Sequence, residues 1–284
     1  MRTFQVFLSL SVLACSGGTE PGPVEVCDGS SEVRLAIRVV VDPGLLELGQ
    51  QVMYDNGATF LFVDGTCTAH VKTSELWGPT LKGPVSDVTS LVGDLRVARW
   101  KEWAGVYEGG ATDGSTVLFE DGEVFIACTN GCTDVAQDIE ELPDAAHAWI
   151  ERLAMDAEAV SGPVRVSVVR YERGPEASAL EWPLATDIDD LAVDEVDVDL
   201  EFGSGRLIEG DDADILRSIR EEYRAGEHGL LAPYIPFRID GDTQFSYWAY
   251  YRDVLPFEDP DGLVPAFHDP ESLTAWPSDM LREE

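Results

Sequence analysis

The pattern of apolar and β-branched positions predicts a chain built largely of strands. Residues 33–41 (VRLAIRVVV) are rich in the β-branched side chains that fit a pleated strand, and residues 163–171 show the same pattern. Later segments place an Asp-Gly pair between two apolar runs, within residues 59–71, 117–128 and 236–251. Because Asp-Gly readily supplies the positive backbone angles of a tight turn, each segment is predicted to be an antiparallel hairpin.

Apolar residues recur at helical spacing in three further places. They lie between residues 134 and 160, where Pro143 is expected to break or restart the helix, between 88 and 95, and between 215 and 223, where Gly226 follows as a stop. Hairpins with separate helices are typical of an α+β fold, not of a parallel doubly wound sheet. We therefore expect mainly antiparallel hairpins with about three helices, stapled by disulfides.

A strongly acidic block follows in the second half of the chain. Residues 187–214 hold many Asp and Glu side chains and one basic residue, Arg206. Within the block, valines and Leu200 alternate with acidic residues from 193 to 201, which predicts a strand with one wet, acidic face. Such a block could bind Ca²⁺, although the loop spacing of a specific calcium site is absent and a solvated acidic face is the alternative.

The first residues carry the features of an export signal. An apolar run from Phe4 to Leu13, interrupted only by three polar residues, is too short to span a bilayer as a helix. The run ends in Val12-Leu13-Ala14-Cys15 and so resembles the lipobox of bacterial lipoproteins. The resemblance implies that Cys15 receives a diacylglyceryl group and becomes the acylated N-terminus after cleavage. The alternative is a buried N-terminal strand with an incidental cysteine.

The net charge of the chain disfavours some classes of binding partner. The chain of 284 residues has 19 Lys and Arg against 54 Asp and Glu, a formal net charge of -35. This balance disfavours nucleic acid and also docking on an anionic membrane through a basic patch. We expect the protein to bind membrane lipid through acylated Cys15 instead. Ser16, which follows this cysteine, resembles the outer-membrane sorting pattern of lipoproteins, so we expect a cell-envelope location on the periplasmic side or the cell surface.

Four cysteines remain after the lipid-bearing one, and four cysteines permit three pairings. In an exported chain an even count favours disulfides. We expect the pairs Cys27–Cys67 and Cys128–Cys132, with redox chemistry or metal ligation as the alternatives. The spacing of the second pair is not that of a Cys-x-x-Cys redox motif, and nothing nearby completes a zinc site.

These features divide the chain into four parts. We expect a signal peptide at 1–14, a lipidated tether at 15–23, an N-terminal α+β domain at 24–180, and an acidic, aromatic-rich region at 181–284 that either stands alone or belongs to the same domain. Residues 27–30, 33–36 and 63–67 resemble segments of lipoproteins that recur in myxobacteria. That family brings no activity that could be transferred to this chain.

No motif selects a reaction. The chain lacks Gly-x-Ser-x-Gly, His-Glu-x-x-His, the phosphate loop and the dinucleotide loop, and its four histidines are scattered. No cofactor or metal is therefore expected. The aromatic segment near the C-terminus is the remaining candidate, and its members are Tyr247, Trp248, Tyr250 and Tyr251. On a strand, one face would join the core, and the other would either contact a glycan or partner protein or be buried as well.

The sequence therefore predicts a lipid-anchored extracytoplasmic envelope protein, a non-catalytic binding or structural module with an unknown protein or glycan partner. One alternative is an extracytoplasmic hydrolase or carbohydrate-active enzyme that uses a pair of carboxylates. So acidic a chain always contains some pair of acids, and nothing in the sequence selects one of them. The other alternative is a calcium-stabilised adhesion module.

Overall fold

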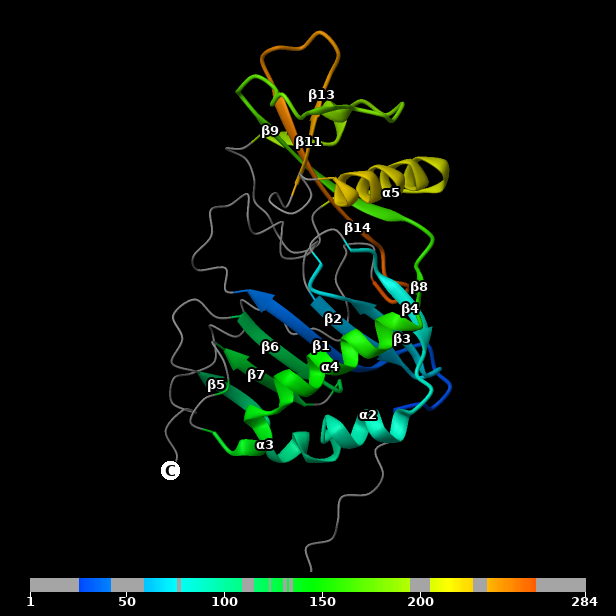
Figure 1. Cartoon of the computed structure of the whole chain (residues 1–284), viewed down its shortest axis with the longest axis vertical. Coiled ribbons are helices and arrows are strands. Elements are labelled where there is room, and N and C mark those ends of the chain that lie inside the picture. The colour runs from blue at the N-terminus through cyan, green and yellow to red at the C-terminus, as the bar shows by residue number, and fades with distance from the viewer. Residues whose placement is uncertain are drawn as a thin grey trace, which may run out of the picture.

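The computed structural model describes residues 26–41, 59–75, 78–108, 115–122, 124–129, 132, 135–194, 205–226 and 234–258. These residues form two β-sheets that follow one another along the longest axis of the molecule (Figure 1). Helices accompany each sheet, and most neighbouring strands run antiparallel. The predicted α+β class is confirmed.

The first sheet has eight strands in the order β5-β7-β6-β1-β2-β3-β4-β8. Their bounds are β1 Val33–Val41, β2 Thr59–Asp64, β3 Thr68–Lys72, β4 Leu81–Pro84, β5 Gly105–Glu108, β6 Ser115–Glu120, β7 Phe125–Thr129 and β8 Glu158–Ala159. The predicted first strand, β1, lies at the centre between β2 and β6 and is antiparallel to both. Every residue of β2 is buried, so both faces of the sheet are covered at this point.

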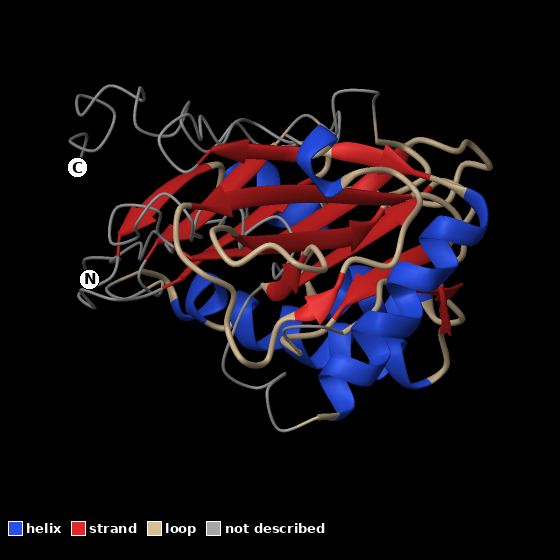
Figure 2. Ribbon diagram, turned by 90° about the horizontal axis from the view of Figure 1, so that it is seen from above, coloured by secondary structure: helices blue, strands red, loops and turns tan. Residues whose placement is uncertain are grey.

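One face of this sheet is covered by a helical layer. It comprises α2 Val88–Asp94, the 3-10 helix η2 Val97–Glu102, α3 Gln137–Glu140 and α4 Leu142–Met155 (Figures 1 and 2). Alternate strand residues such as Leu35 and Ile37 pack with Trp100 and Trp149 of the helical layer in one core. Pro143 lies in the first turn of α4, where its missing N–H is not needed, which explains why the helix restarts there.

The second sheet has the order β10-β13-β14-β9-β11, with β12 also paired to β9. Its strands are β9 Val164–Tyr171, β10 Leu180–Glu181, β11 Ala192–Asp194, β12 Arg206–Ile208, β13 Ile235–Arg238 and β14 Ser246–Asp253. Helix α5, Gly210–Ala225, packs on one face through Ala213 and Leu216, and Gly226 is its C-cap as expected. Only the first two residues of the predicted acidic strand, within β11, fall in the described part of the chain.

The chain passes from one sheet to the other between β8 and β9. Strand β9 pairs along its whole length with β14, from Val164 with Asp253 to Tyr171 with Ser246. The change of sheet therefore falls between residues 159 and 164, within the stretch 24–180 that we predicted as one α+β domain. The reason is that β9 needs a long antiparallel partner, and that partner comes from the acidic, aromatic-rich region.

The three predicted hairpins are confirmed, but their turns differ. Gly122 and Gly241 have positive φ values of 87° and 80°, as expected of an Asp-Gly turn. In the β2–β3 hairpin the left-handed residue is instead Cys67, with φ 62°, and its N–H donates to the carbonyl of Asp64 at 3.0 Å. In a hairpin turn of this kind, the residue with left-handed backbone follows the turn and forms a β-bulge. The turn therefore does not require a glycine at position 65 for its backbone angles.

Gly65 is needed because the N-terminal segment lies directly on it. The N–H of Gly29 donates to its carbonyl at 2.6 Å, and its own N–H donates to the carbonyl of Glu32 at 2.9 Å. A Cβ on Gly65 would lie 2.9 Å from the carbonyl oxygen of Ser30 and would also collide with the Asp28 side chain. The segment that begins the described chain is therefore held by close backbone contact.

Both expected disulfides are present. Cys27–Cys67 joins the N-terminal segment to the β2–β3 turn, and Cys128–Cys132 joins a residue of β7 to the cysteine four positions later. On the chain-entropy model a loop of 40 residues gives roughly 4 kcal/mol of stability and the short one about 2 kcal/mol. The first disulfide and the contacts of Gly65 thus stabilise the same attachment.

We expect Gly65→Ala to lower the free energy of unfolding by about 1 to 3 kcal/mol, because the added methyl group overpacks the contact with Ser30. Gly93→Ala is the matched control, since its Cβ would enter open space in α2 and helix propensity favours alanine. Urea denaturation of both variants checks the expectation. Equal stability of the Gly65→Ala variant and the parent protein would show that this contact is not tight.

Candidate functional site

The aromatic strand β14 presents two faces, as its sequence predicted. Tyr247 and Tyr251 lie on the face that packs with α5, in the core of the second sheet. The hydroxyl of Tyr251 donates to the carbonyl of Leu216 at 2.9 Å, and that of Tyr247 donates to Asp189 at 2.8 Å. Trp248 and Tyr250 lie on the other face, in a separate cluster with Val169.

Three of the four candidate binding residues are buried. Tyr247, Tyr250 and Tyr251 are each only 1% exposed, which agrees with burial, the second of the two outcomes considered for this strand. Burial raises the pKa of each of these phenols, so they remain neutral. They serve the core and do not form an open platform for a glycan or a partner protein.

Trp248 is half-buried, and its ring is already in contact with neighbours from the same chain. Tyr234 stacks on it with ring centroids 3.7 Å apart and an interplanar angle of 4°, and Tyr171 lies at 4.2 Å. The guanidinium of Arg173 lies 4.4 Å from the centroid of the Trp248 ring. The Tyr234 hydroxyl donates to Glu176 at 3.3 Å, and burial together with this carboxylate raises the pKa of Tyr234 to about 12. On this face, Trp248 is therefore in contact with side chains of its own chain.

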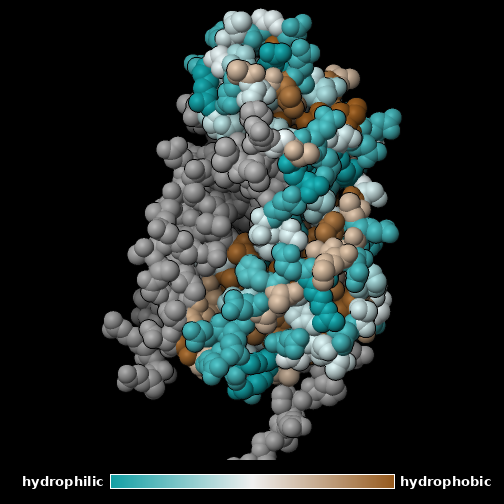
Figure 3. Space-filling view, viewed as in Figure 1, coloured by the Kyte–Doolittle hydropathy of each residue, from teal (hydrophilic) through white to brown (hydrophobic). Residues whose placement is uncertain are grey.

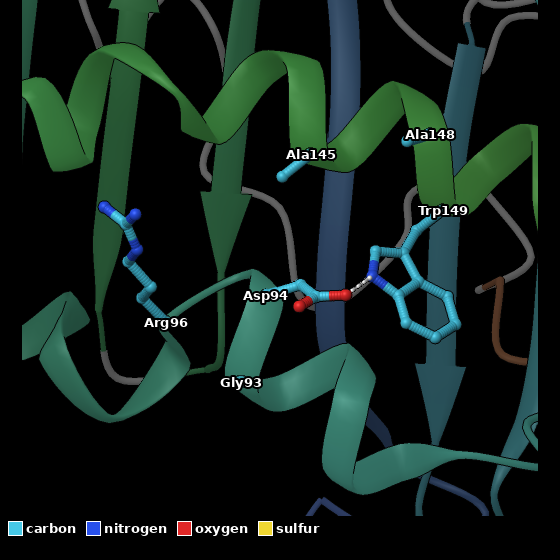
Figure 4. Close-up of a pocket in the computed structure, with 6 residues that line it drawn as sticks. All are labelled: Gly93, Asp94, Arg96, Ala145, Ala148 and Trp149. Carbon is cyan, nitrogen blue, oxygen red and sulfur yellow. Dashed lines mark hydrogen bonds between the residues drawn. The ribbon is translucent and has the colours of Figure 1, made fainter.

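A hollow of about 430 Å³ lies between α2 and α4 (Figure 4). The indole N–H of Trp149 donates across it to Asp94 at 3.0 Å. Arg96, at its edge, has left-handed backbone with φ 51°, and its guanidinium pairs with Asp138 and Glu141. The polar groups of Asp94, Trp149 and Arg96 are thus already engaged in hydrogen bonds or ion pairs, and Ala145 and Ala148 complete the lining.

A second hollow, of about 320 Å³, lies at the edge of the second sheet beside β10 and β13. Trp182 forms part of its wall, with the indole N–H donated to the carbonyl of Thr186 at 2.7 Å. Glu181 and Arg238 stand 3.6 Å apart at the same place. This hollow is also lined by groups that interact with one another.

Among the described residues, a cluster of charged side chains is buried where the two sheets meet. We call it the junction cluster, and its members are Lys72, Arg165, Arg217, Arg220, Arg252, Asp253 and Glu258. At its centre Asp253, 2% exposed, accepts hydrogen bonds from Arg217 at 2.8 Å, from Arg220 at 3.0 Å and from the backbone N–H of Thr80 at 3.1 Å. One carboxylate thereby connects β14, α5 and the residue before β4.

Glu258 repeats this arrangement on the other side of β14. Its side chain is fully buried and accepts from Arg165 at 2.9 Å, from Arg252 at 2.6 and 2.8 Å, and from the N–H of Leu255 at 3.2 Å. Each buried carboxylate therefore holds two guanidinium groups and one backbone N–H. These are the charge-assisted contacts that make burial of a charge tolerable.

The cluster shifts the pKa values of its members. Burial by itself would raise the pKa of Asp253, but Arg220, Arg217 and the Thr80 N–H outweigh it and hold that pKa below its usual range. Burial, followed by repulsion from Arg220 and Arg252, lowers the pKa of Lys72 to about 7. Burial also lowers the pKa of His70, on the same strand, to about 4, although Asp64 opposes this.

The sequence did not reveal the junction cluster. Its members come from β3, β9, α5, β14 and the turn after it, and no short motif links them. The one available signal was that arginine and lysine alternate with apolar residues inside predicted strands, as at Lys72, Arg165 and Arg252. Of the other predicted site residues, the four disulfide cysteines are paired as expected, and Cys15 lies outside the described residues.

Three further findings bear on function. Among the described residues, no group of three or more His, Cys, Asp or Glu side chains is placed to hold a metal ion. None of the helices described is both long and apolar enough to cross a membrane. Comparison with protein-family models, with curated proteins and with solved structures found no match.

We expect Asp253→Asn to lower the free energy of unfolding by about 3 to 5 kcal/mol, because two buried guanidinium groups lose their counter-charge. Asp214→Asn is the matched control: Asp214 also accepts from Arg217, at 3.0 Å, but its side chain is 75% exposed, so little change is expected. Urea denaturation at pH 7 compares the two. Similar small losses in both variants would contradict the central role of Asp253.

Proposed function

We propose that the protein is an exported lipoprotein, anchored through acylated Cys15 to a membrane of the cell envelope, and that its two-sheet domain is a binding or structural module and not an enzyme. Segment 4–15 supplies the signal and the anchor in this proposal. Because acyl chains contribute about 0.8 kcal/mol for each buried methylene, two or more chains would hold the domain at the membrane.

The observation that carries the proposal is the Cys27–Cys67 disulfide together with the burial of Val26. Disulfides persist mainly in oxidising compartments outside the cytoplasm. This one forms part of the attachment of the N-terminal segment. Residue 26, 2% exposed, already belongs to the core of the first sheet.

In this proposal the tether predicted at 15–23 connects the anchor to the core of the first sheet, which includes Val26. The tether contains Pro and Gly, which are typical of linkers. Fully extended, the chain from Cys15 to Val26 would span at most about 40 Å. The domain would therefore stay close to the membrane surface. Hydrophilic residues gather on the face over α5 (Figure 3), and the net charge of -35 would favour solubility.

In cells fed an alkyne-bearing fatty acid, we expect the parent protein to become labelled and to sediment with membranes, whereas Cys15→Ser should lose the label and the membrane association. Ser16→Ala is the matched control and should keep both, because it leaves the cysteine intact. Non-reducing peptide mapping of all three proteins should recover Cys27–Cys67, which shows that the variants fold. An unlabelled parent protein with free thiols in the cytosol would refute the proposal.

A further inference from the structure

The two disulfides differ in their exposure to solvent. Cys128 and Cys132 are 0% and 4% exposed, and both belong to the core of the first sheet. Cys27 and Cys67 are only half-buried. Because cleavage of a disulfide requires a thiolate to reach one of its sulfur atoms, access decides which bond reacts. An external thiol can approach Cys27–Cys67 in the folded chain, whereas Cys128–Cys132 requires the core to open.

The Cys67 end of the exposed disulfide is held in place by backbone contacts of its own. Its N–H donates to the carbonyl of Asp64 at 3.0 Å, within the β2–β3 hairpin. Its carbonyl accepts from the N–H of Val85, the residue after β4, at 2.9 Å. These two hydrogen bonds do not involve the sulfur atom, so the turn is expected to keep its place when the disulfide is broken.

The Cys27 end lies in a segment with no regular secondary structure, residues 26–32, which we call the N-terminal segment. Most of its residues after Cys27 are exposed, and its backbone contacts with the hairpin are those of Gly29 and Glu32 with Gly65. The strand that follows it, β1, is paired on both sides, with β2 and with β6. The disulfide thus links an exposed segment to a turn and a sheet that are held by other interactions.

We propose that Cys27–Cys67 is the site at which a dithiol reductant acts on this protein, and that its reduction detaches the N-terminal segment from the β2–β3 turn while the first sheet stays folded. This regulation goes beyond the proposed function, since it concerns how the domain is joined to whatever precedes it. The residue that would leave the core is Val26, which is 2% exposed in the oxidised form.

The reaction is an exchange of one disulfide for another. A thiolate of the dithiol attacks one sulfur of Cys27–Cys67, which forms a mixed disulfide and releases the other cysteine as a thiolate. The second thiol of the reductant then displaces the remaining cysteine. Two electrons and two protons pass to the protein, which gains two thiols, and the reductant is oxidised to its own disulfide.

Timed reduction of the folded full chain with dithiothreitol, followed by alkylation and peptide mass spectrometry, tests the site. We expect Cys27 and Cys67 to become alkylated at least about tenfold faster than Cys128 and Cys132, because only the first pair is accessible. In concentrated guanidinium chloride the difference should disappear. Equal rates in the folded chain, or a difference that persists in denaturant, would overturn the proposal.

Amide hydrogen exchange tests the detachment. In the double variant Cys27→Ser/Cys67→Ser we expect the protection of the Gly29 amide to fall at least about tenfold, while the β1–β6 ladder amides remain protected. Cys128→Ser/Cys132→Ser is the matched control and should leave Gly29 protected. Unchanged protection of Gly29 in the first variant, or loss of the ladder protection with it, would contradict the proposal. Neither measurement involves Cys15, so both are independent of the membrane anchor.

Discussion

In the part of the chain that the structure describes, the carboxylate of Asp253 joins the two sheets through hydrogen bonds. It accepts from two arginines of α5 and from the Thr80 N–H, so the helix on the second sheet and an edge of the first sheet share one acceptor. Each of these hydrogen bonds has an ionised partner and is out of water, where such bonds are strong and an unmet charge is costly. Asp253 therefore joins the two sheets together with the apolar contacts of Phe60 and Phe62 with Leu255 and Phe257.

The interior and exterior of the protein differ in charge. The whole chain is strongly acidic, yet the charges buried between the sheets are mostly arginines, and both buried carboxylates are fully used by them. The arginines suit this role because a planar guanidinium can hydrogen-bond to a carboxylate and a backbone carbonyl together, as Arg217 does with Asp253 and Gly162. Lys72 has no such fork, and its pKa is lowered to about 7, first by burial and then by Arg220 and Arg252, while Asp253 opposes the shift.

Burial of the aromatic residues of β14 argues against a glycan-binding surface on this strand. An exposed row of tyrosines would have favoured a glycan-binding surface, but β14 uses both of its faces for packing. The remaining hollows are lined by groups that already pair with one another, such as Asp94 with Trp149. Among the described residues, these features therefore do not favour a glycan-binding surface on β14.

The local pattern of the sequence determined most of the elements: the strands from β-branched runs, the hairpins from Asp-Gly, the restart of α4 from Pro143 and the disulfides from the four cysteines that remain after Cys15. These predictions succeed because each depends on neighbours within a few residues, or on the chemistry of one residue type. Tertiary structure alone decided that β9 pairs with β14, that Tyr247, Tyr250 and Tyr251 are all buried, and that two carboxylates collect four arginines. Such pairings join residues far apart in the chain, and charge compensation between them is decided only when packing removes the groups from water.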